Sequence, residues 1–159
     1  MGRIVVDRTL AAGHDVVAFD LDDAAVERAA DVGAEPADSI DDFVDRLGAT
    51  KRIWLMVPAG EAIDVTLEEL EPHLDGDDIV VDGGNSYFEE SVRRAESCPA
   101  AYLDCGTSGG PAGAELGFSL MVGGHSGPTT NSSRSSTPSR PGPTDTSGWV
   151  PPVRATTSR

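Results

Sequence analysis

Four short stretches of this chain combine glycine with small or polar residues and are the candidates for ligand chemistry. They are Gly2-Arg3 and the runs LMVPAG at residues 55–60, DGGNS at 82–86 and GTSGGP at 106–111. Glycine lets the backbone approach a ligand closely, and Asn or Ser side chains both donate and accept hydrogen bonds. A serine flanked by backbone N–H groups, as in the last stretch, indicates a site for an anionic substrate.

Gly2 and Asp20 have the spacing of a dinucleotide-binding turn. In the G-x-G-x-x-G pattern the third glycine lets a helix pack closely on its strand, and an acid about 20 residues later binds the adenosine ribose. Gly2 would be that third glycine, with Arg3 beside it, and the other two glycines would precede Met1. The alternative is an ordinary helix-opening glycine and an unrelated strand-end aspartate.

Ser108 formally completes G-x-S-x-G, the nucleophile elbow of hydrolases. That elbow needs a helix directly after the serine, whereas Gly109, Gly110 and Pro111 follow here, and no histidine is placed as a base. We therefore favour anion binding over acyl transfer. For LMVPAG and DGGNS, the alternative to a ligand site is a plain strand-to-helix turn.

Short apolar runs alternate along the chain with amphipathic patterns. The apolar runs predict strands over residues 15–20, 52–57, 78–82 and 101–105, and the amphipathic patterns predict helices over residues 2–12, 22–31, 39–47, 60–70 and 87–97. This alternation predicts an α/β fold with a Rossmann-type, doubly wound parallel sheet and the glycine turns along one rim. Because the pattern opens on a helix, we expect the sheet to lack its first, central strand and the isolated chain to be unstable or partly molten.

The formal net charge of −15 excludes function classes that need a basic surface. It argues against nucleic acid and against an anionic membrane as partners. A body so acidic, with Lys51 as its single lysine, indicates a protein of a high-salt cytoplasm. Two cysteines, no signal sequence and no long apolar run also predict a cytoplasmic protein, and no metal-ligand spacing is present.

Composition changes at about residue 125. Residues 125–159 contain no Leu, Ile, Phe, Met or Lys, and 21 of these 35 residues are Ser, Thr or Pro. We therefore expect residues 1–124 to be a partial dinucleotide-binding domain and residues 125–159 to be a disordered tail. The shifted reading frame from Gly127 onward can encode a segment ending in GSGHYVK, with acids and a helical apolar pattern. An out-of-frame tail is thus our preferred hypothesis, and a genuine tail is the alternative.

Over residues 1–124 these motifs together resemble the 6-phosphogluconate dehydrogenases. LMVPAG is similar to that family's LMVKAG loop, DGGNS to its DGGN signature, and GTSGGPAGAELGFSLMVGG to its substrate loop. The shifted-frame GHYVK resembles the segment that holds the family's catalytic lysine. The 3-hydroxyisobutyrate-type dehydrogenases share the fold and the S-G-G loop, but they carry D-x-S-S-x-x-P where this chain has DGGNS. A non-enzymatic nucleotide-binding module with a disordered tail is a third hypothesis.

The resemblance implies a reaction and a set of binding residues. A hydride passes from C3 of 6-phosphogluconate to NAD or NADP while a lysine takes the proton of the 3-hydroxyl. Carbon dioxide then leaves, and a glutamate helps form ribulose 5-phosphate. Neither catalytic group is among the residues of this chain, so we expect it to have no turnover alone. The implied substrate-binding residues are Asn85, Ser108, Gly109 and Gly110. The implied cofactor-binding residues are Gly2, Arg3, Asp20, Met56, Val57, Pro58, Ala59, Gly60 and Asn85. A homo-oligomer is implied for the full-length family but not for this fragment.

Two departures from the family pattern bear on the cofactor. The family's NADP users often have Asn-Arg where this chain has Asp20-Leu21. A carboxylate repels a 2′-phosphate, so Asp20 favours NAD. Pro58 replaces the usual lysine of the LMVKAG loop, which leaves cofactor contact there to the backbone.

Overall fold

The computed structural model describes residues 1–109 and 117–125. The helices are α1 (Gly2–Ala11), α2 (Asp23–Ala30), α3 (Ile40–Arg46), α4 (Glu61–Leu70), the 3-10 turn η1 (Glu71–His73) and α5 (Phe88–Ser97). The strands are β1 (Val17–Ala18), β2 (Glu35–Pro36), β3 (Arg52–Leu55), β4 (Ile79–Asp82), β5 (Ala101–Ser108) and β6 (Ser119–His125). The predicted Rossmann-type α/β fold is confirmed, and each predicted helix is present within a residue of the expected bounds at either end.

Local capping explains where two of these helices begin. Ser39 accepts a hydrogen bond from the Asp42 N–H at 3.1 Å and caps α3. Asp22 accepts one from the Ala24 N–H at 3.1 Å and caps α2. Such caps satisfy N–H groups that the first helical turn leaves unpaired. Both helices therefore begin after a short polar side chain, whose oxygen accepts the hydrogen bond that a carbonyl of a preceding turn would otherwise accept.

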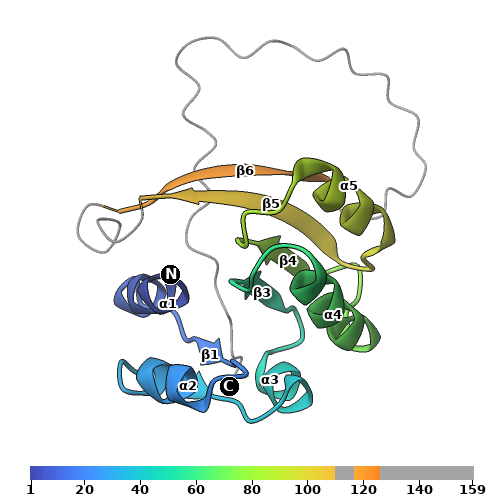
Figure 1. Ribbon diagram of the computed structural model, residues 1–159. Helices are drawn as coiled ribbons and strands as arrows, with labels where there is room; N and C mark the ends of the chain where they lie inside the picture. The colour runs from blue at the N-terminus through green and yellow to red at the C-terminus, as the bar shows by residue number, and fades with distance from the viewer. Residues whose placement is uncertain (110–116, 126–159) are drawn as a thin grey trace.

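The strands form two separate sheets (Figure 1). Strands β3, β4 and β5 are parallel, with Leu55 opposite Asp82 and Asp82 opposite Asp104. Strands β1 and β2 form a two-stranded parallel sheet of their own. The order of the larger sheet is β3-β4-β5-β6, so β3 is its edge on the side of β1. The sheet is thus divided between β1 and β3, as expected for one that lacks a central strand.

Four details of the strands differ from the sequence prediction. The strand expected over residues 15–20 is reduced to Val17–Ala18, because it pairs on one side only. Strand β2 was not predicted from the sequence, and it forms by pairing with β1. Strand β5 continues to Ser108 because β6 pairs with it, and that pairing is antiparallel rather than parallel. Strand β6 also includes His125, which the sequence placed in the tail.

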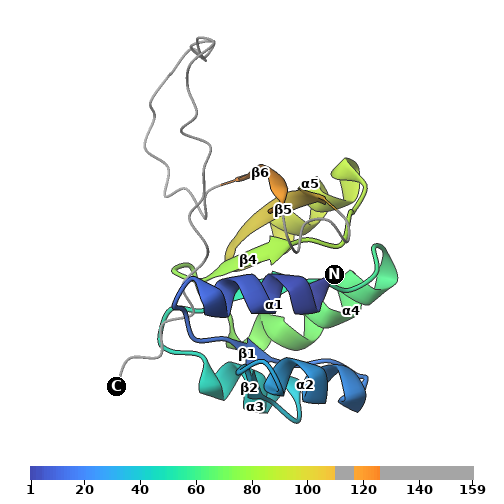
Figure 2. The same ribbon diagram turned by 90° about the vertical axis from the view of Figure 1, so that its left-hand side faces the viewer.

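Helices lie on both sides of the larger sheet. Figures 1 and 2 show α1 on one side of β3 and α4 on the other. The main core forms on the α4 side, where Ile53, Leu55, Ile63, Leu70 and Val80 are buried together. Helix α1, in contrast, has no buried residue. No helix in the described ranges is long and apolar enough to cross a membrane. Of the tail predicted over residues 125–159, residues 126–159 lie outside the described residues.

Candidate functional site

The parallel strands bring three loops to one edge of the sheet. Because Leu55, Asp82 and Asp104 are in register, the segments that follow them leave the sheet at the same level. These are the 56–60 loop (Met56–Gly60), the 82–86 turn (Asp82–Ser86) and the outer half of β5. Ligands of open α/β sheets bind outside the carboxyl ends of the strands. The edge is therefore where a ligand is expected.

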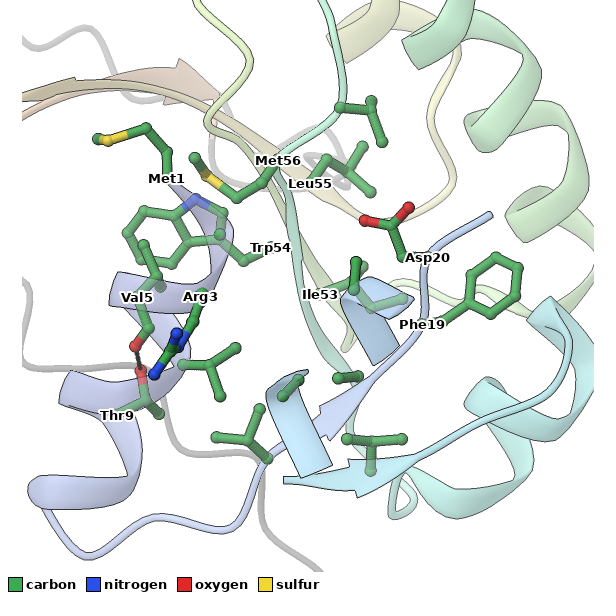
Figure 3. Close-up of a pocket in the computed structure, with 18 of the residues that line it drawn as sticks. Met1, Arg3, Val5, Thr9, Phe19, Asp20, Ile53, Trp54, Leu55 and Met56 are labelled. Carbon is green, nitrogen blue, oxygen red and sulfur yellow. Dashed lines mark hydrogen bonds between the residues drawn. The ribbon is translucent and has the colours of Figure 1, made fainter. Parts of the chain in front are cut away.

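A cavity of about 1730 Å³ opens between β1, β3 and α1 (Figure 3). Its lining is mostly apolar, with Val5, Val17 and Ile53 among the side chains that face it. It also reaches the strand ends and includes six of the nine predicted cofactor residues. These are Gly2, Arg3, Asp20, Met56, Val57 and Pro58. The structure therefore brings most of the predicted cofactor residues to one cavity.

The N-terminus of α1 lies beside the end of β3. A Cβ placed on Gly2 would be 3.6 Å from the Met56 Cβ, an ordinary van der Waals distance, so the start of the helix lies directly against the 56–60 loop. The first N–H groups of a helix have no partner within the helix, and they favour anions such as phosphates. Here the first hydrogen bond within the helix is donated by the Ile4 N–H, to the Met1 carbonyl at 3.0 Å. The N–H groups of Gly2 and Arg3 come before the Ile4 N–H in the helix, and these two donors suit a pyrophosphate.

Asp20 follows β1 and is exposed at the opposite wall of the cavity. Its Oδ1 accepts a hydrogen bond from the Asp22 N–H at 3.0 Å, which fixes the carboxylate at the start of α2. A carboxylate held in this way can accept hydrogen bonds from two ribose hydroxyls. Gly2 and Asp20 thus stand on two sides of one opening, as a dinucleotide requires.

The 82–86 turn is built around a fully buried aspartate. Asp82 accepts hydrogen bonds from the Gly84 N–H at 2.8 Å, from the Ser86 hydroxyl at 2.6 Å and from the Tyr102 hydroxyl at 2.6 Å. Burial and this hydrogen bond to Asp82 raise the pKa of Tyr102, so its phenol stays a donor. Asp82 therefore holds the 82–86 turn from its buried side, and the exposed side of the turn is left open to a ligand.

Asn85 stands at the tip of that turn. Its φ of 63° is left-handed, a region that Asn tolerates better than most residues, and its side chain is exposed. The neighbouring Gly84 has no space for a side chain, since a Cβ there would lie 2.5 Å from the Val57 carbonyl oxygen. The 82–86 turn is thus packed directly on the 56–60 loop, and Asn85 lies next to the cofactor side of the site.

Ser108 and Gly109 lie farther along β5. Ser108 pairs with Ser119 and is four residues beyond Asp104, or about 13 Å at roughly 3.3 Å per strand residue. Both residues are exposed, and Thr107 together with Ser119 lines the cavity. Gly110 lies outside the described residues. The structure therefore brings six of the nine predicted cofactor residues to one cavity. Asn85 lies outside its lining, on the turn whose Gly84 packs against Val57, and Ser108 lies at the outer end of β5.

Sequence reasoning missed the polar side chains beneath this surface. Arg94 and Tyr102 are each 2% exposed, and both contact Asp82. The available signal was Arg94 itself, because arginine is seldom fully buried unless it is paired. For metals, no cluster of three or more His, Cys, Asp or Glu side chains that could hold an ion occurs in the described ranges.

Sequence comparison relates residues 1–133 to one known domain family. They match the profile of the NAD binding domain of 6-phosphogluconate dehydrogenase, and the match runs past residue 124. Over 124 residues the chain is 81% identical to the NAD(+)-dependent, decarboxylating 6-phosphogluconate dehydrogenase of Haloferax volcanii. The aligned part covers 78% of this chain and 42% of that relative. The chain thus spans about two fifths of the relative's length.

Solved structures give the same picture of the fold. The 6-phosphogluconate dehydrogenase of Plasmodium falciparum superposes with a TM-score of 0.70 at 26% identity, covering 79% of this chain and 29% of the other. The 3-hydroxyisobutyrate dehydrogenase of Mycobacterium tuberculosis gives a TM-score of 0.70 at 25% identity, covering 79% and 43%. Since the two scores are equal, the backbone alone does not separate these enzyme classes.

Proposed function

Because this chain belongs to the family of NAD(P)-binding domains of 6-phosphogluconate dehydrogenase, an oxidoreductase family, we propose that it binds NAD within an enzyme that oxidises and decarboxylates 6-phosphogluconate. The observation that carries this proposal is the packing of Gly2 and of the 82–86 turn, through Gly84, against the 56–60 loop at one sheet edge. The whole enzyme's activity is part of the proposal, because the chain spans about two fifths of the Haloferax relative.

The residues of this chain have binding and orienting roles. The N–H groups of Gly2 and Arg3 hold the pyrophosphate, and Asp20 accepts hydrogen bonds from the adenosine ribose. Met56, Val57 and Pro58 form the wall beside the nicotinamide, with Ala59 and Gly60 leading into α4. When bound, the nicotinamide accepts a hydride from the substrate's 3-hydroxyl carbon.

The substrate side uses polar groups along the same edge. Asn85 contacts both the substrate and the cofactor, and Ser108, Gly109 and Gly110 hold the sugar acid through a hydroxyl and backbone N–H groups. Asn85 is the discriminating position, because the motif DGGNS separates this family from the 3-hydroxyisobutyrate-type enzymes by resemblance. The chain's own residues thus orient a phosphorylated sugar acid against the nicotinamide.

Asp20 is the basis for preferring NAD. Its carboxylate is exposed at the position where the adenosine ribose would bind, and a 2′-phosphate there would meet a negative charge. The name of the Haloferax relative, which is NAD(+)-dependent, supports the same preference. We therefore propose NAD as the cofactor and expect NADP to bind more weakly.

A chimeric enzyme tests this function. In it, the 124-residue stretch shared with the Haloferax relative is taken from this chain, and the relative supplies the rest of its own sequence. We expect NAD reduction and carbon dioxide release with 6-phosphogluconate, little turnover of 3-hydroxyisobutyrate, and a lower kcat/KM with NADP. Turnover of 3-hydroxyisobutyrate in preference to 6-phosphogluconate would reject the substrate assignment, and equal use of both cofactors would reject the role of Asp20.

A further inference from the structure

Arg94 is a buried arginine that the proposed binding roles leave unused. It lies on α5 and is 2% exposed, and its guanidinium reaches toward the sheet edge rather than toward solvent. Burying an ion pair is expensive, and apolar residues of similar volume often give equal or greater stability. Fold stability alone is therefore a poor explanation for an arginine at this position.

One side of the guanidinium binds the end of the 56–60 loop. Arg94 Nη2 donates to the Gly60 carbonyl at 3.1 Å, at the residue that precedes α4. Arg94 Nε donates to Asp64 Oδ1 at 2.8 Å and Nη2 to Asp64 Oδ2 at 3.3 Å, which is a two-pronged contact with the first turn of α4. Gly60 has a φ of 95°, so this backbone is held in a conformation that few other residues adopt.

The other side binds the 82–86 turn. Arg94 Nη1 donates to the Ser86 Oγ at 3.0 Å, and the Ser86 hydroxyl in turn donates to Asp82 Oδ2 at 2.6 Å. Arg94 Nη1 also lies 3.8 Å from Asp82 Oδ2. Asn85 is therefore flanked by one residue that Arg94 contacts, Ser86, and by Gly84, which packs on Val57.

From this geometry we propose that Arg94 is a positioning residue, which links the 56–60 loop to the 82–86 turn and thereby sets where Asn85 stands relative to the cofactor. The inference rests on the proposed function, because it assigns the two segments to cofactor and substrate. A rigid, planar guanidinium can bridge Gly60, Asp64 and Ser86 at once, whereas a lysine ammonium cannot reproduce that fork.

The test is Arg94→Lys in the chimera, which keeps the charge and removes the fork. We expect kcat with 6-phosphogluconate to fall by about 10- to 100-fold, since a misplacement of about 1 Å can cost roughly that much. KM for NAD should change less, because Gly2 and Asp20 are untouched. Kinetics are measured at a salt concentration and temperature where circular dichroism shows both proteins to be fully folded.

Arg93→Lys is the matched control. Arg93 is the adjacent arginine and also pairs with Asp64, with Nη2 at 2.9 Å from Oδ1, but its side chain is 61% exposed. Since it is not seen to contact Gly60 or Ser86 in the described ranges, we expect kcat to stay within about twofold of the unsubstituted chimera, as for most surface changes. Both variants keep the positive charge. A difference in kcat between them would therefore come from the contacts of Arg94 with Gly60 and Ser86.

Ser86→Ala is a second variant that tests the same proposal if Arg94→Lys does not fold. It removes the link to the 82–86 turn while Arg94 keeps Asp64 and Gly60, so kcat should again fall more than KM for NAD rises. Equal kcat in the Arg94→Lys and Arg93→Lys chimeras, or unchanged kcat in Ser86→Ala, would overturn the inference. An unsubstituted chimera without 6-phosphogluconate turnover would instead reject the proposed function.

Discussion

Residues 1–37 and residues 52–108 contribute to the same candidate site, but they differ in how tightly they are packed. In the first region the buried apolar residues are three alanines, Ala29, Ala34 and Ala37. In the second they include large side chains on both strands and helices, among them Ile53, Leu55, Ile63, Leu70, Val80 and Tyr102. The two regions therefore draw on very different amounts of buried apolar surface, the main source of folding free energy.

The cause of the difference is the gap between β1 and β3. Within residues 1–109 and 117–125, β1 pairs only with β2 and β3 only with β4, so two strand edges face the cavity. Val5 and Val6 of α1 line this cavity, as Figure 3 shows for Val5, and no residue of that helix is buried. One further parallel strand in the gap would pair with both edges and cover α1.

This contrast separates the two halves of the site. Gly2 and Asp20, which we propose to bind the pyrophosphate and the adenosine ribose, belong to the loosely packed region. Asn85 belongs to the region where Asp82, Tyr102 and Arg94 form a buried hydrogen-bonded network. We infer that the 82–86 turn is preformed, whereas the binding of the adenosine half depends on how well α1 and β1 are held.

The largest expected effect comes from the packed region. Ile63 is fully buried against the β3–β4 face, and Ile63→Ala should lower the free energy of unfolding by about 2–5 kcal/mol. Val5→Ala on α1 should change it by less than about 1 kcal/mol, because Val5 faces the cavity and alanine favours the helix. Urea unfolding of the chain at high salt, followed by circular dichroism, measures both.

The pair of substitutions is a direct test of the contrast between regions. Val65→Ala, at an exposed position of the same helix as Ile63, is the control for changes in helix propensity. If Val5→Ala cost as much as Ile63→Ala, α1 would be packed as firmly as α4. The division of the molecule into two regions would then be wrong.

Helices were predicted well from the sequence, and edge strands poorly. Ser39 and Asp22 cap their helices through contacts within three residues, so a local pattern was enough. Strand β6 depends on pairing with β5 across the intervening residues, and its glycines were interpreted as part of a substrate loop. Gly124 is required there because a Cβ would lie 2.6 Å from the Tyr102 carbonyl oxygen. That constraint comes from a partner strand, which no local pattern reveals.

In the candidate site, too, features set by local patterns were predicted and features set by distant partners were not. The grouping of Gly2, Asp20 and Met56 was predictable because parallel strands end at one edge. The position of Ser108 was not, since pairing with β6 extends β5 by three residues past the predicted end at Cys105. Arg94 was not predicted either, because its partner Asp64 is 30 residues away in the sequence. Residues whose roles depend on distant partners required the structure.

Salt should act first on the loosely packed region. Both regions are acidic, with eight acidic and three basic residues in 1–37 and 13 and three in 52–108, but the first has much less buried apolar surface to offset the repulsion. Asp23 and Glu27 of α2 and its C-cap residue Asp31 stand at successive i,i+4 positions. A few like-charge pairs at roughly 0.2–0.5 kcal/mol each sum to about 1–2 kcal/mol, which molar salt screens. The high-salt character predicted from composition fits the Haloferax relative.

Hydrogen exchange at two salt concentrations measures this effect. When KCl is lowered from about 2 M to about 0.1 M, where the Debye length grows to about 10 Å, amides of α1 and α2 should lose protection before those of β3 and β4. Loss of protection in both regions together would indicate a single cooperative unit. Equal protection at both concentrations would contradict the high-salt prediction itself.

The smallest expected effect is the acid sensitivity of Asp64 in the packed region. The hydrogen bond from Arg94, aided by Arg93 and opposed by burial, holds the pKa of Asp64 below its usual value. A carboxyl whose pKa is lower in the folded state stabilises the fold above its unfolded pKa, near 4, and loses that contribution as pH falls through the folded value. Because the side chain is 33% exposed, solvent screening limits the effect to about 1 kcal/mol.

Asp64→Asn should therefore flatten the fall in unfolding free energy below about pH 4, while Glu68→Gln, at an exposed position of the same helix, should leave the slope unchanged. Urea unfolding at a series of pH values in constant salt gives the slopes. If Asp64→Asn left the fall in unfolding free energy below about pH 4 unchanged, the contact between Asp64 and Arg94 would not stabilise the packed region.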